Sequence, residues 1–183
     1  GHHAETAVQA PQLGTAHAVL QAESALAGFE GVVLILFADV PLLRAETMAR
    51  LVQAVADGAG IAVLGFRPAV PGAYGRILAD GDGAIRKMVE AKDATAEELA
   101  VPLCNSGLMA VRADLLFPLL KQVDNNNAAQ EYYLPDIVML ASARGERAIV
   151  LEGGADEVIG VNSRAELAAA ELLFQQGRRA QAM

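Results

Sequence analysis

The sequence predicts an α/β protein built on a mostly parallel sheet with helices on both faces. Two unbroken apolar runs, residues 32–37 and 61–66, suit central strands that are covered by helices on both sides. Between them, apolar residues recur at helical spacing, so the order strand, helix, strand indicates a right-handed crossover between parallel strands. A length of 183 residues with 54% hydrophobic residues predicts one domain with a sizeable core.

The elements around these two strands follow from local patterns. Residues 4–8 predict a short strand, and a loop over 9–15 leads into an alanine-rich helix over 15–26. Apolar residues at i, i+3, i+4 and i+7 predict a second helix over 45–57, which the glycines of 58–60 end.

The pattern changes after residue 66. Strands over 74–78 and 84–90 flank the sequence Asp-Gly-Asp-Gly at 80–83, which is a strong hairpin signal. A hairpin inserted in such a sheet is expected to serve a site rather than the core. A short acidic helix over 94–99 is expected to follow it.

The second half of the chain again alternates strands and helices. We expect a strand within 102–111, a helix around 115–123, a helix over 131–143, a strand over 148–151 and a last helix to about residue 176. Asn162 or Ser163 is the expected N-cap of that last helix. No repeat or linker divides the chain, so 4–183 is interpreted as one domain and 1–3 as a candidate tag remnant.

Composition excludes several classes of function. The formal net charge of −8 is not confined to a tail, which disfavours nucleic acid as a partner. No run of about 18 uncharged apolar residues predicts a membrane span, and no basic-then-apolar N-terminus predicts secretion. Cys104 is the only cysteine, which excludes an internal disulfide and predicts a reducing, cytoplasmic location.

Five polar residues stand where a ligand could be held, and each has a purely structural alternative. Asp39 follows the first buried strand, at the end where open α/β sheets bind ligands, but a loop aspartate can also cap a helix. Asn162 can complete a metal site with Asp39 or cap the last helix. Glu90 can be a solvated strand end, Asn105 a satisfied buried amide, and Thr15 a plain helix cap.

Seven segments match one family in order. They are residues 9–18, 37–42, 74–77, 89–94, 105–107, 125–136 and 160–164. Together they resemble the uridylyltransferase domain of the bacterial bifunctional N-acetylglucosamine-1-phosphate uridyltransferase/glucosamine-1-phosphate acetyltransferase. The segment from Asn-Asn-Asn to Glu-Tyr-Tyr is specific to this family among sugar nucleotidyltransferases, whereas Ala-Asp-Val-Pro-Leu is shared more widely.

The resemblance implies a Rossmann-like nucleotidyltransferase fold and a definite reaction. The phosphate oxygen of N-acetylglucosamine 1-phosphate attacks the α-phosphorus of UTP. The products are pyrophosphate and UDP-N-acetylglucosamine, a precursor of peptidoglycan and lipopolysaccharide. The substrate brings its own nucleophile, so the protein's task is alignment and charge neutralisation around Mg²⁺.

The resemblance also implies roles for ten residues. Asp39 and Asn162 would hold the Mg²⁺, a hard cation that prefers oxygen ligands. The substrate contacts would be Gln9, Gly14 and Thr15 for the uracil, Phe37 and Ala38 for the nucleotide floor, and Gly75, Glu90 and Asn105 for the N-acetylglucosamine. Phe37 and Ala38 stand where the family more often has Tyr-Gly, which is a mild departure.

Part of the family's pattern is not found in these 183 residues. The family begins with a strand and a glycine-rich loop that carry an Arg and a Lys around the triphosphate, and such sites rely on amides and cations. We therefore expect a partial domain, incomplete at its N-terminus, with no catalytic residue of its own and low activity by itself. Full-length members also carry a β-helix acetyltransferase domain and are homotrimers.

Two other functions remain open from the sequence. One is another nucleotidyltransferase, such as a molybdenum-cofactor cytidylyl- or guanylyltransferase, against which the Gln-Leu-Gly-Thr loop and the Glu-Tyr-Tyr segment argue. The other is a non-catalytic sugar-nucleotide-binding module, which would bind the ligand without releasing pyrophosphate.

Overall fold

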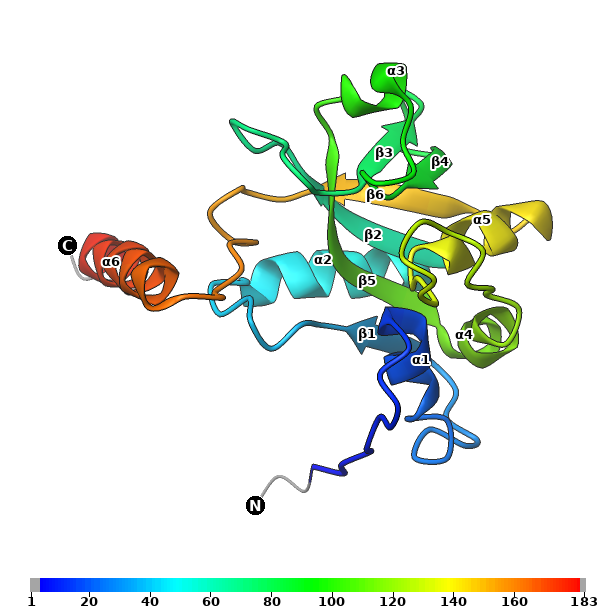
Figure 1. The fold of residues 1–183 in the computed structure, drawn as a ribbon. Coiled ribbons are helices and arrows are strands. Elements are labelled where there is room, and N and C mark those ends of the chain that lie inside the picture. Colours follow the sequence, from blue (N-terminus) through cyan, green and yellow to red (C-terminus); the bar gives the residue numbers. More distant parts are fainter. Residues whose placement is uncertain (1–3, 182–183) are drawn as a thin grey trace.

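The fold is organised around β5 (Cys104–Arg112), the longest strand of a six-stranded sheet. A computed structural model describes residues 4–181. β2 (Ile61–Phe66) pairs with β5 along almost its whole length. The remaining edge of β5 is shared by β3 (Arg76–Ala79) near its start and by β1 (Val32–Ile35) near its end. β5 therefore ties three other strands into one sheet (Figure 1).

The predicted α/β class is confirmed, but the sheet is mixed, and its strand pairs are mostly antiparallel where mostly parallel pairs were expected. β2 and β6 (Ala148–Glu152) are the parallel pair among the described strands, whereas β5 runs antiparallel to β1, β2 and β3. β4 (Ile85–Val89) forms the predicted hairpin with β3. An apolar run indicates that a strand is buried on both faces, but it does not indicate the direction of the adjacent strands. The sequence therefore could not show that β5 lies antiparallel between β1 and β2.

Helices cover both faces of the sheet, as the sequence predicts. α2 (Ala45–Ala56) packs on one face, where Leu51 and Val55 meet Ala62, Leu64 and Ala110. The other face is covered by α1 (Thr15–Leu20), α4 (Ala113–Leu120) and α5 (Asp136–Ala143). Successive residues of β2 and β5 alternate between these two cores, which is the period-two pattern of a strand.

Several elements differ from their predicted bounds. Residues 4–8 form no strand, and α1 ends at Leu20 and continues as turns to residue 28. The helix predicted over 131–143 begins only at Asp136, because residues 131–134 bond to another loop and Pro135 precedes the first turn. The short acidic helix is α3 (Ala96–Leu99), which begins with a capping box between Thr95 and Glu98.

The last helix, α6 (Arg164–Gln181), stands away from the sheet (Figure 1). The predicted cap is Ser163, whose Oγ accepts from the Glu166 amide at 3.2 Å. Glu166 reciprocates by accepting from the Asn162 amide at 2.8 Å. No helix within residues 4–181 is long and apolar enough to cross a bilayer. Residues 1–3, the candidate tag remnant, lie outside the described part of the chain.

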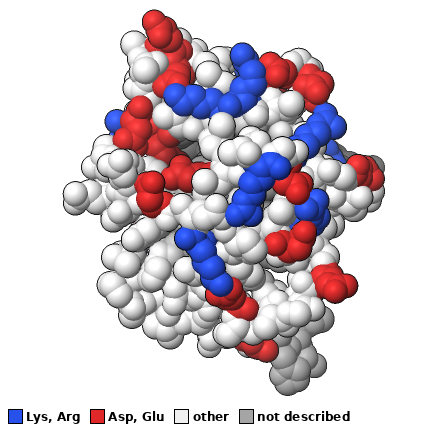
Figure 2. Space-filling view, turned by 90° about the vertical axis from the view of Figure 1, so that its right-hand side faces the viewer, with Lys and Arg blue, Asp and Glu red and all other residues white. Residues whose placement is uncertain are grey.

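Charges of both signs are interspersed on the side of the molecule that carries α4 and α5 (Figure 2). Exposed ion pairs include Lys121–Glu23 at 2.5 Å and Arg147–Asp82 at 3.3 Å. This face therefore presents no continuous basic surface of the kind that tracks a phosphate backbone.

The sheet core predicts a clear contrast between two leucines. Leu116 of α4 is fully buried, whereas Leu172 of α6 is 59% exposed. We expect Leu116→Ala to lower the free energy of unfolding by about 2–5 kcal/mol because it leaves a cavity, and Leu172→Ala to change it by less than about 0.5 kcal/mol. Urea denaturation followed by circular dichroism measures both, and equal losses would contradict the fold described here.

Candidate functional site

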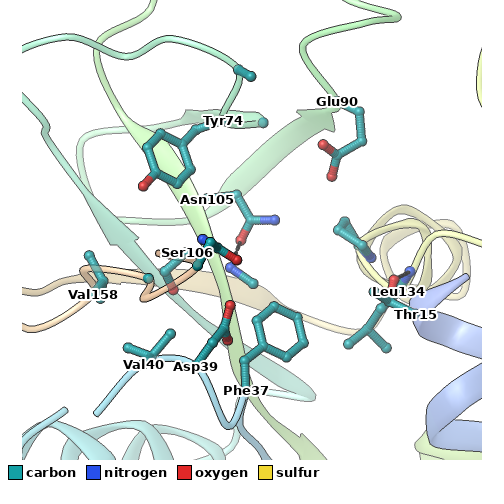
Figure 3. Close-up of a pocket in the computed structure, with 16 residues that line it drawn as sticks. Thr15, Phe37, Asp39, Val40, Tyr74, Glu90, Asn105, Ser106, Leu134 and Val158 are labelled. Carbon is teal, nitrogen blue, oxygen red and sulfur yellow. Dashed lines mark hydrogen bonds between the residues drawn. The ribbon is translucent and has the colours of Figure 1, made fainter. Parts of the chain in front are cut away.

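A cavity of about 290 Å³ opens beyond the carboxyl ends of β1, β2 and β6 (Figure 3). These three strands run in one direction, so the loops that follow them meet at one edge of the sheet. β5 runs the opposite way and therefore begins at the same edge. This is the position at which open α/β sheets hold ligands.

Seven of the ten residues predicted to bind substrate or metal line this cavity. They are Thr15, Phe37, Asp39, Gly75, Glu90, Asn105 and Asn162. Gln9, Gly14 and Ala38 are not in its wall, although Gly14 adjoins Thr15 and Ala38 lies between two lining residues. Residues separated by more than 140 positions in the sequence are thus gathered around one space.

The floor of the cavity is the contact between Phe37 and Gly107. Gly107 has a φ of +83°, and a Cβ built on it would lie 2.2 Å from Cε2 of Phe37. The aromatic ring therefore rests on bare backbone that any side chain would displace. A glycine is required here both for its backbone conformation and for its lack of a side chain.

Asn105 is buried and is held by the same turn. Its Oδ1 accepts from the Gly107 amide at 2.9 Å, which leaves the Nδ2 group as the donor. Figure 3 shows this nitrogen directed toward the space that the Glu90 carboxylate also faces. The neighbouring Ser106 hydroxyl donates to the Leu64 carbonyl at 2.7 Å, which fixes the segment against β2. Asn105 therefore combines its two predicted roles. Its side-chain oxygen is satisfied as in a structural amide, and its side-chain nitrogen faces the cavity, where a ligand could bind.

Gly75 and Glu90 form the wall next to Asn105. The Gly75 carbonyl accepts from the backbone N–H of Asn105 at 2.9 Å. A Cβ at Gly75 would lie 3.3 Å from each carboxylate oxygen of Glu90, so this glycine lets the carboxylate lie against the backbone. The wall thus offers an amide donor and a carboxylate acceptor side by side, a combination that suits the hydroxyl groups of a sugar.

Arg76 fixes the loop that carries Gly75 and Tyr74. Only 3% of Arg76 is exposed, and its guanidinium donates to the carbonyls of Leu99 and Gly72, each at 3.3 Å, and of Tyr74. Buried polar groups must be bonded, so these carbonyls and the guanidinium hold one another in place.

Carboxylates gather on the Glu90 side of the cavity. The pKa of Glu90 is raised, first by burial and then by the nearby charges of Asp136 and Asp93. The pKa of Asp136 is raised to about 6, again by burial first and then by Asp124 and Asp93. These groups hold protons more tightly in the folded chain than in free solution.

Asp39 and Asn162 are brought together across Gly160. The Val161 amide donates to the Asp39 carbonyl at 2.8 Å, which joins their two loops. A Cβ at Gly160 would lie 3.8 Å from Oδ2 of Asp39 and 3.5 Å from Nδ2 of Asn162, so the glycine leaves the space between them clear. One carboxylate and one carboxamide around a clear space fit a hard cation that keeps several waters. Residues 4–181 contain no group of three or more His, Cys, Asp or Glu arranged to hold a metal.

The loop that carries Asn162 is anchored by Glu157. Glu157 is 5% exposed, and its carboxylate accepts from the Thr47 hydroxyl of α2 at 2.5 Å and from the Gly154 amide at 3.3 Å. Arg44 adds an ion pair to Asp156 at 2.7 Å. The position of the loop after β6 is therefore set by α2, which follows the loop of Asp39 in the chain.

Two sequence motifs near the cavity form a single structural unit. The Tyr132 amide donates to the Leu13 carbonyl at 2.8 Å, and the Leu134 amide donates to Oγ1 of Thr15 at 2.9 Å. A Cβ at Gly14 would lie 2.6 Å from the Tyr132 carbonyl oxygen, so only glycine permits this approach. The interpretation of Thr15 as a plain helix cap is wrong, because its hydroxyl bonds to Leu134 and Gly14 stands at the N-cap without a side-chain bond.

Several lining residues were not assigned a role from the sequence. Tyr74, Leu134 and Val158 contribute to the wall. The Tyr74 ring packs edge-on against Phe66, with centroids 4.9 Å apart. Tyr74 lies within the Tyr-Gly-Arg-Ile motif and could have been found there, but Val158 follows no motif and only the fold places it.

The chain matches one protein family and several curated proteins. The family described as "Nucleotidyl transferase" matches residues 2–154. The protein "Bifunctional protein GlmU" of Rhizorhabdus wittichii is 61% identical over 181 residues, which is 98% of this chain and 40% of that protein. Its counterpart in Rhodospirillum rubrum is 54% identical over 180 residues, covering 97% of this chain and 40% of that protein. The chain thus spans about two fifths of the length of these relatives.

Solved structures share the fold. A UDP-glucose pyrophosphorylase in complex with UDP-glucose superposes with a TM-score of 0.68 at 19% identity, over 92% of this chain and 64% of that one. A CMP:2-keto-3-deoxy-manno-octonic acid synthetase in complex with CTP gives a TM-score of 0.63 at 17% identity, over 88% and 68%. The chain therefore shares its mixed α/β architecture with these two structures.

The contact between Phe37 and Gly107 predicts a coupled pair of substitutions. Gly107→Ala is expected to lower the free energy of unfolding by about 1–3 kcal/mol, through its left-handed backbone and its clash with the ring. In a Phe37→Ala background the clash is gone, so the same change should cost less. Chemical denaturation of the four proteins measures this coupling, and simple additivity would show that the ring does not rest on Gly107.

Asp136 predicts a pH dependence of stability. Its carboxyl binds a proton more tightly when folded, so the protonated form favours folding and this stabilisation is lost as the pH rises from about 4 to about 6. Asp136→Asn should therefore melt at a higher temperature than the parent at pH 7.5 and at nearly the same temperature at pH 4. Calorimetry at both pH values tests this, and a variant less stable at pH 7.5 would contradict it.

Proposed function

This chain belongs to the nucleotidyl transferase family, and from that premise we propose that its cavity serves uridylyl transfer from UTP to N-acetylglucosamine 1-phosphate. The products would be UDP-N-acetylglucosamine and pyrophosphate, a step in the synthesis of cell-wall precursors. The observation that supports this most is the gathering of Asp39 and Asn162 with Gly75, Glu90 and Asn105 around one space. The identity of 61% to a protein named bifunctional GlmU supports the same choice of reaction.

The reaction needs alignment more than it needs a protein nucleophile. An oxygen of the sugar phosphate attacks the α-phosphorus of the nucleotide, and pyrophosphate leaves from the opposite side. Phe37, resting on Gly107, would support the nucleotide, and the wall of Gly75, Glu90 and Asn105 would hold the sugar. Fixing both reactants in this way converts a bimolecular encounter into a step within one complex.

Asp39 and Asn162 would hold Mg²⁺ through a carboxylate oxygen and an amide oxygen. When bound, the cation supplies charge neutralisation for the phosphate oxygens. Glu157 ties the start of the loop that carries Asn162 to Thr47 and Gly154, which would limit the movement of Asn162 relative to Asp39.

Sugar recognition would rest on complementary polarity. Asn105 offers an amide donor because its oxygen is occupied by Gly107, and Glu90 offers an acceptor when it is ionised. The raised pKa of Glu90 means that sugar binding should strengthen as the pH rises past that pKa, since the ionised carboxylate is the better acceptor.

We further propose that this chain has low activity by itself. Among the described residues, no Lys or Arg lines the cavity, although a triphosphate carries several negative charges. Mg²⁺ neutralises part of that charge, and phosphate sites normally add cations and backbone amides. The same observation favours, as a second candidate, a module that binds the sugar nucleotide without catalysis. The single buried cysteine is consistent with a cytoplasmic setting for either function.

Titration of UDP-N-acetylglucosamine into the chain, with and without Mg²⁺, tests this function. We expect Glu90→Gln to weaken binding of the sugar nucleotide by about tenfold while leaving UTP binding unchanged, because it replaces a charged acceptor oxygen that would face the sugar hydroxyls with an NH₂ donor. Glu97→Gln, on exposed α3, is the matched control and should change neither. Asp39→Ala should remove the strengthening by Mg²⁺. Equal effects of Glu90→Gln on both ligands would contradict the placement of the sugar.

A further inference from the structure

Gln9 and His17 form a hydrogen-bonded pair outside the cavity wall, on either side of the Gly14–Thr15 turn in the sequence. Nε2 of Gln9 lies 2.9 Å from the Gly14 carbonyl oxygen and 3.1 Å from Nδ1 of His17. All three residues belong to α1 or the loop that precedes it, and Gly14 is joined directly to Thr15 in the cavity wall. This carboxamide is therefore bonded directly to the residue that precedes Thr15.

The orientation of the Gln9 carboxamide is fixed by chemistry. The Gly14 carbonyl can only accept a hydrogen bond, so the group that faces it must be the NH₂ of Gln9 and not its oxygen. When the second N–H is given to His17, both donors of the amide are used. Oε1, which only accepts, is then the one side-chain group of Gln9 left for a ligand.

The ring of His17 must be in one tautomer for this to hold. A neutral imidazole accepts through one nitrogen, and two amides compete for it: Gln9 at 3.1 Å from Nδ1 and Gln21 at 3.3 Å from Nε2. Gln21 is already bonded to the His17 carbonyl at 2.8 Å. The shorter contact assigns acceptance to Nδ1, so the proton lies on Nε2 and Gln9 keeps both of its bonds.

We propose that His17 is a specificity-determining residue of the nucleobase site, which selects uracil over cytosine by holding Gln9 with its oxygen free. Uracil carries a proton on N3 and can donate to Oε1 of Gln9. Cytosine has an unprotonated N3, which would face that oxygen as acceptor against acceptor. This inference rests on the proposed function and on the contact between Gln9 and uracil that the family resemblance implies, and it adds the residue that sets the polarity of that contact.

Two nearly isosteric substitutions separate hydrogen bonding from packing. His17→Asn keeps an acceptor oxygen close to the position of Nδ1, whereas His17→Leu has the same shape and no acceptor. Calorimetric titration of the chain with UTP and with CTP gives the ratio of the two affinities for each protein. We expect His17→Leu to reduce the preference for UTP by about tenfold, the worth of one hydrogen bond, and His17→Asn to retain most of it.

Gln21→Met serves as a further control, because it removes the competing amide and should leave the preference for UTP intact. Equal loss in the Asn and Leu variants, or no loss in either, would overturn the inference. The ring tautomer, read from long-range ¹H–¹⁵N correlations of the unliganded chain, tests it independently of binding, and a proton on Nδ1 would also overturn it. Failure of the parent chain to bind either nucleotide would contradict the proposed function and this inference with it, whereas equal binding of UTP and CTP by the parent chain would overturn this inference alone.

Discussion

The pairing of β5 with three other strands is the constraint on which the cavity depends. β5 is antiparallel to β1 and β2, so its first residues lie at the edge of the sheet where β1, β2 and β6 end. Asn105, Ser106 and Gly107 are among those first residues. They contact the loop before β3 at Gly75, strand β2 at Leu64 and the loop after β1 at Phe37. Loss of this register would separate the wall of Gly75, Glu90 and Asn105 from the floor at Phe37.

Close approaches at glycines complete the site. The ring of Phe37 packs on Gly107, the carboxylate of Glu90 lies against Gly75, and the backbone of Tyr132 approaches Gly14. Gly160 leaves space between Asp39 and Asn162. Each of these is a contact that a Cβ would narrow or block. Anchors outside the cavity, such as Arg76 and Glu157, then hold the loops that carry these glycines, so the cavity is shaped by groups that do not touch a ligand.

Much of this architecture was predictable from the sequence, and the reasons differ from element to element. The strands at 61–66 and 85–89, helix α2 and the hairpin turn follow from local periodicity and turn chemistry. The place of Asp39 at a strand end followed from the same pattern. The direction of β5 could not be predicted in this way, because a strand buried on two faces has the same apolar pattern in either direction. The late start of α5 could not be predicted from local pattern either. A loop more than 100 residues away in the sequence forms hydrogen bonds with residues 132–134 and keeps them out of the helix.

The central claim is that one cavity holds a sugar nucleotide between the Asn105 wall and the Asp39–Asn162 pair. A crystal structure of the chain grown with UDP-N-acetylglucosamine and Mg²⁺ tests it most directly. The account predicts the sugar between Gly75, Glu90 and Asn105, the uracil beside Gln9, and the cation between Asp39 and Asn162. A ligand bound in another part of the molecule, or a sugar that does not contact Glu90 or Asn105, would contradict it.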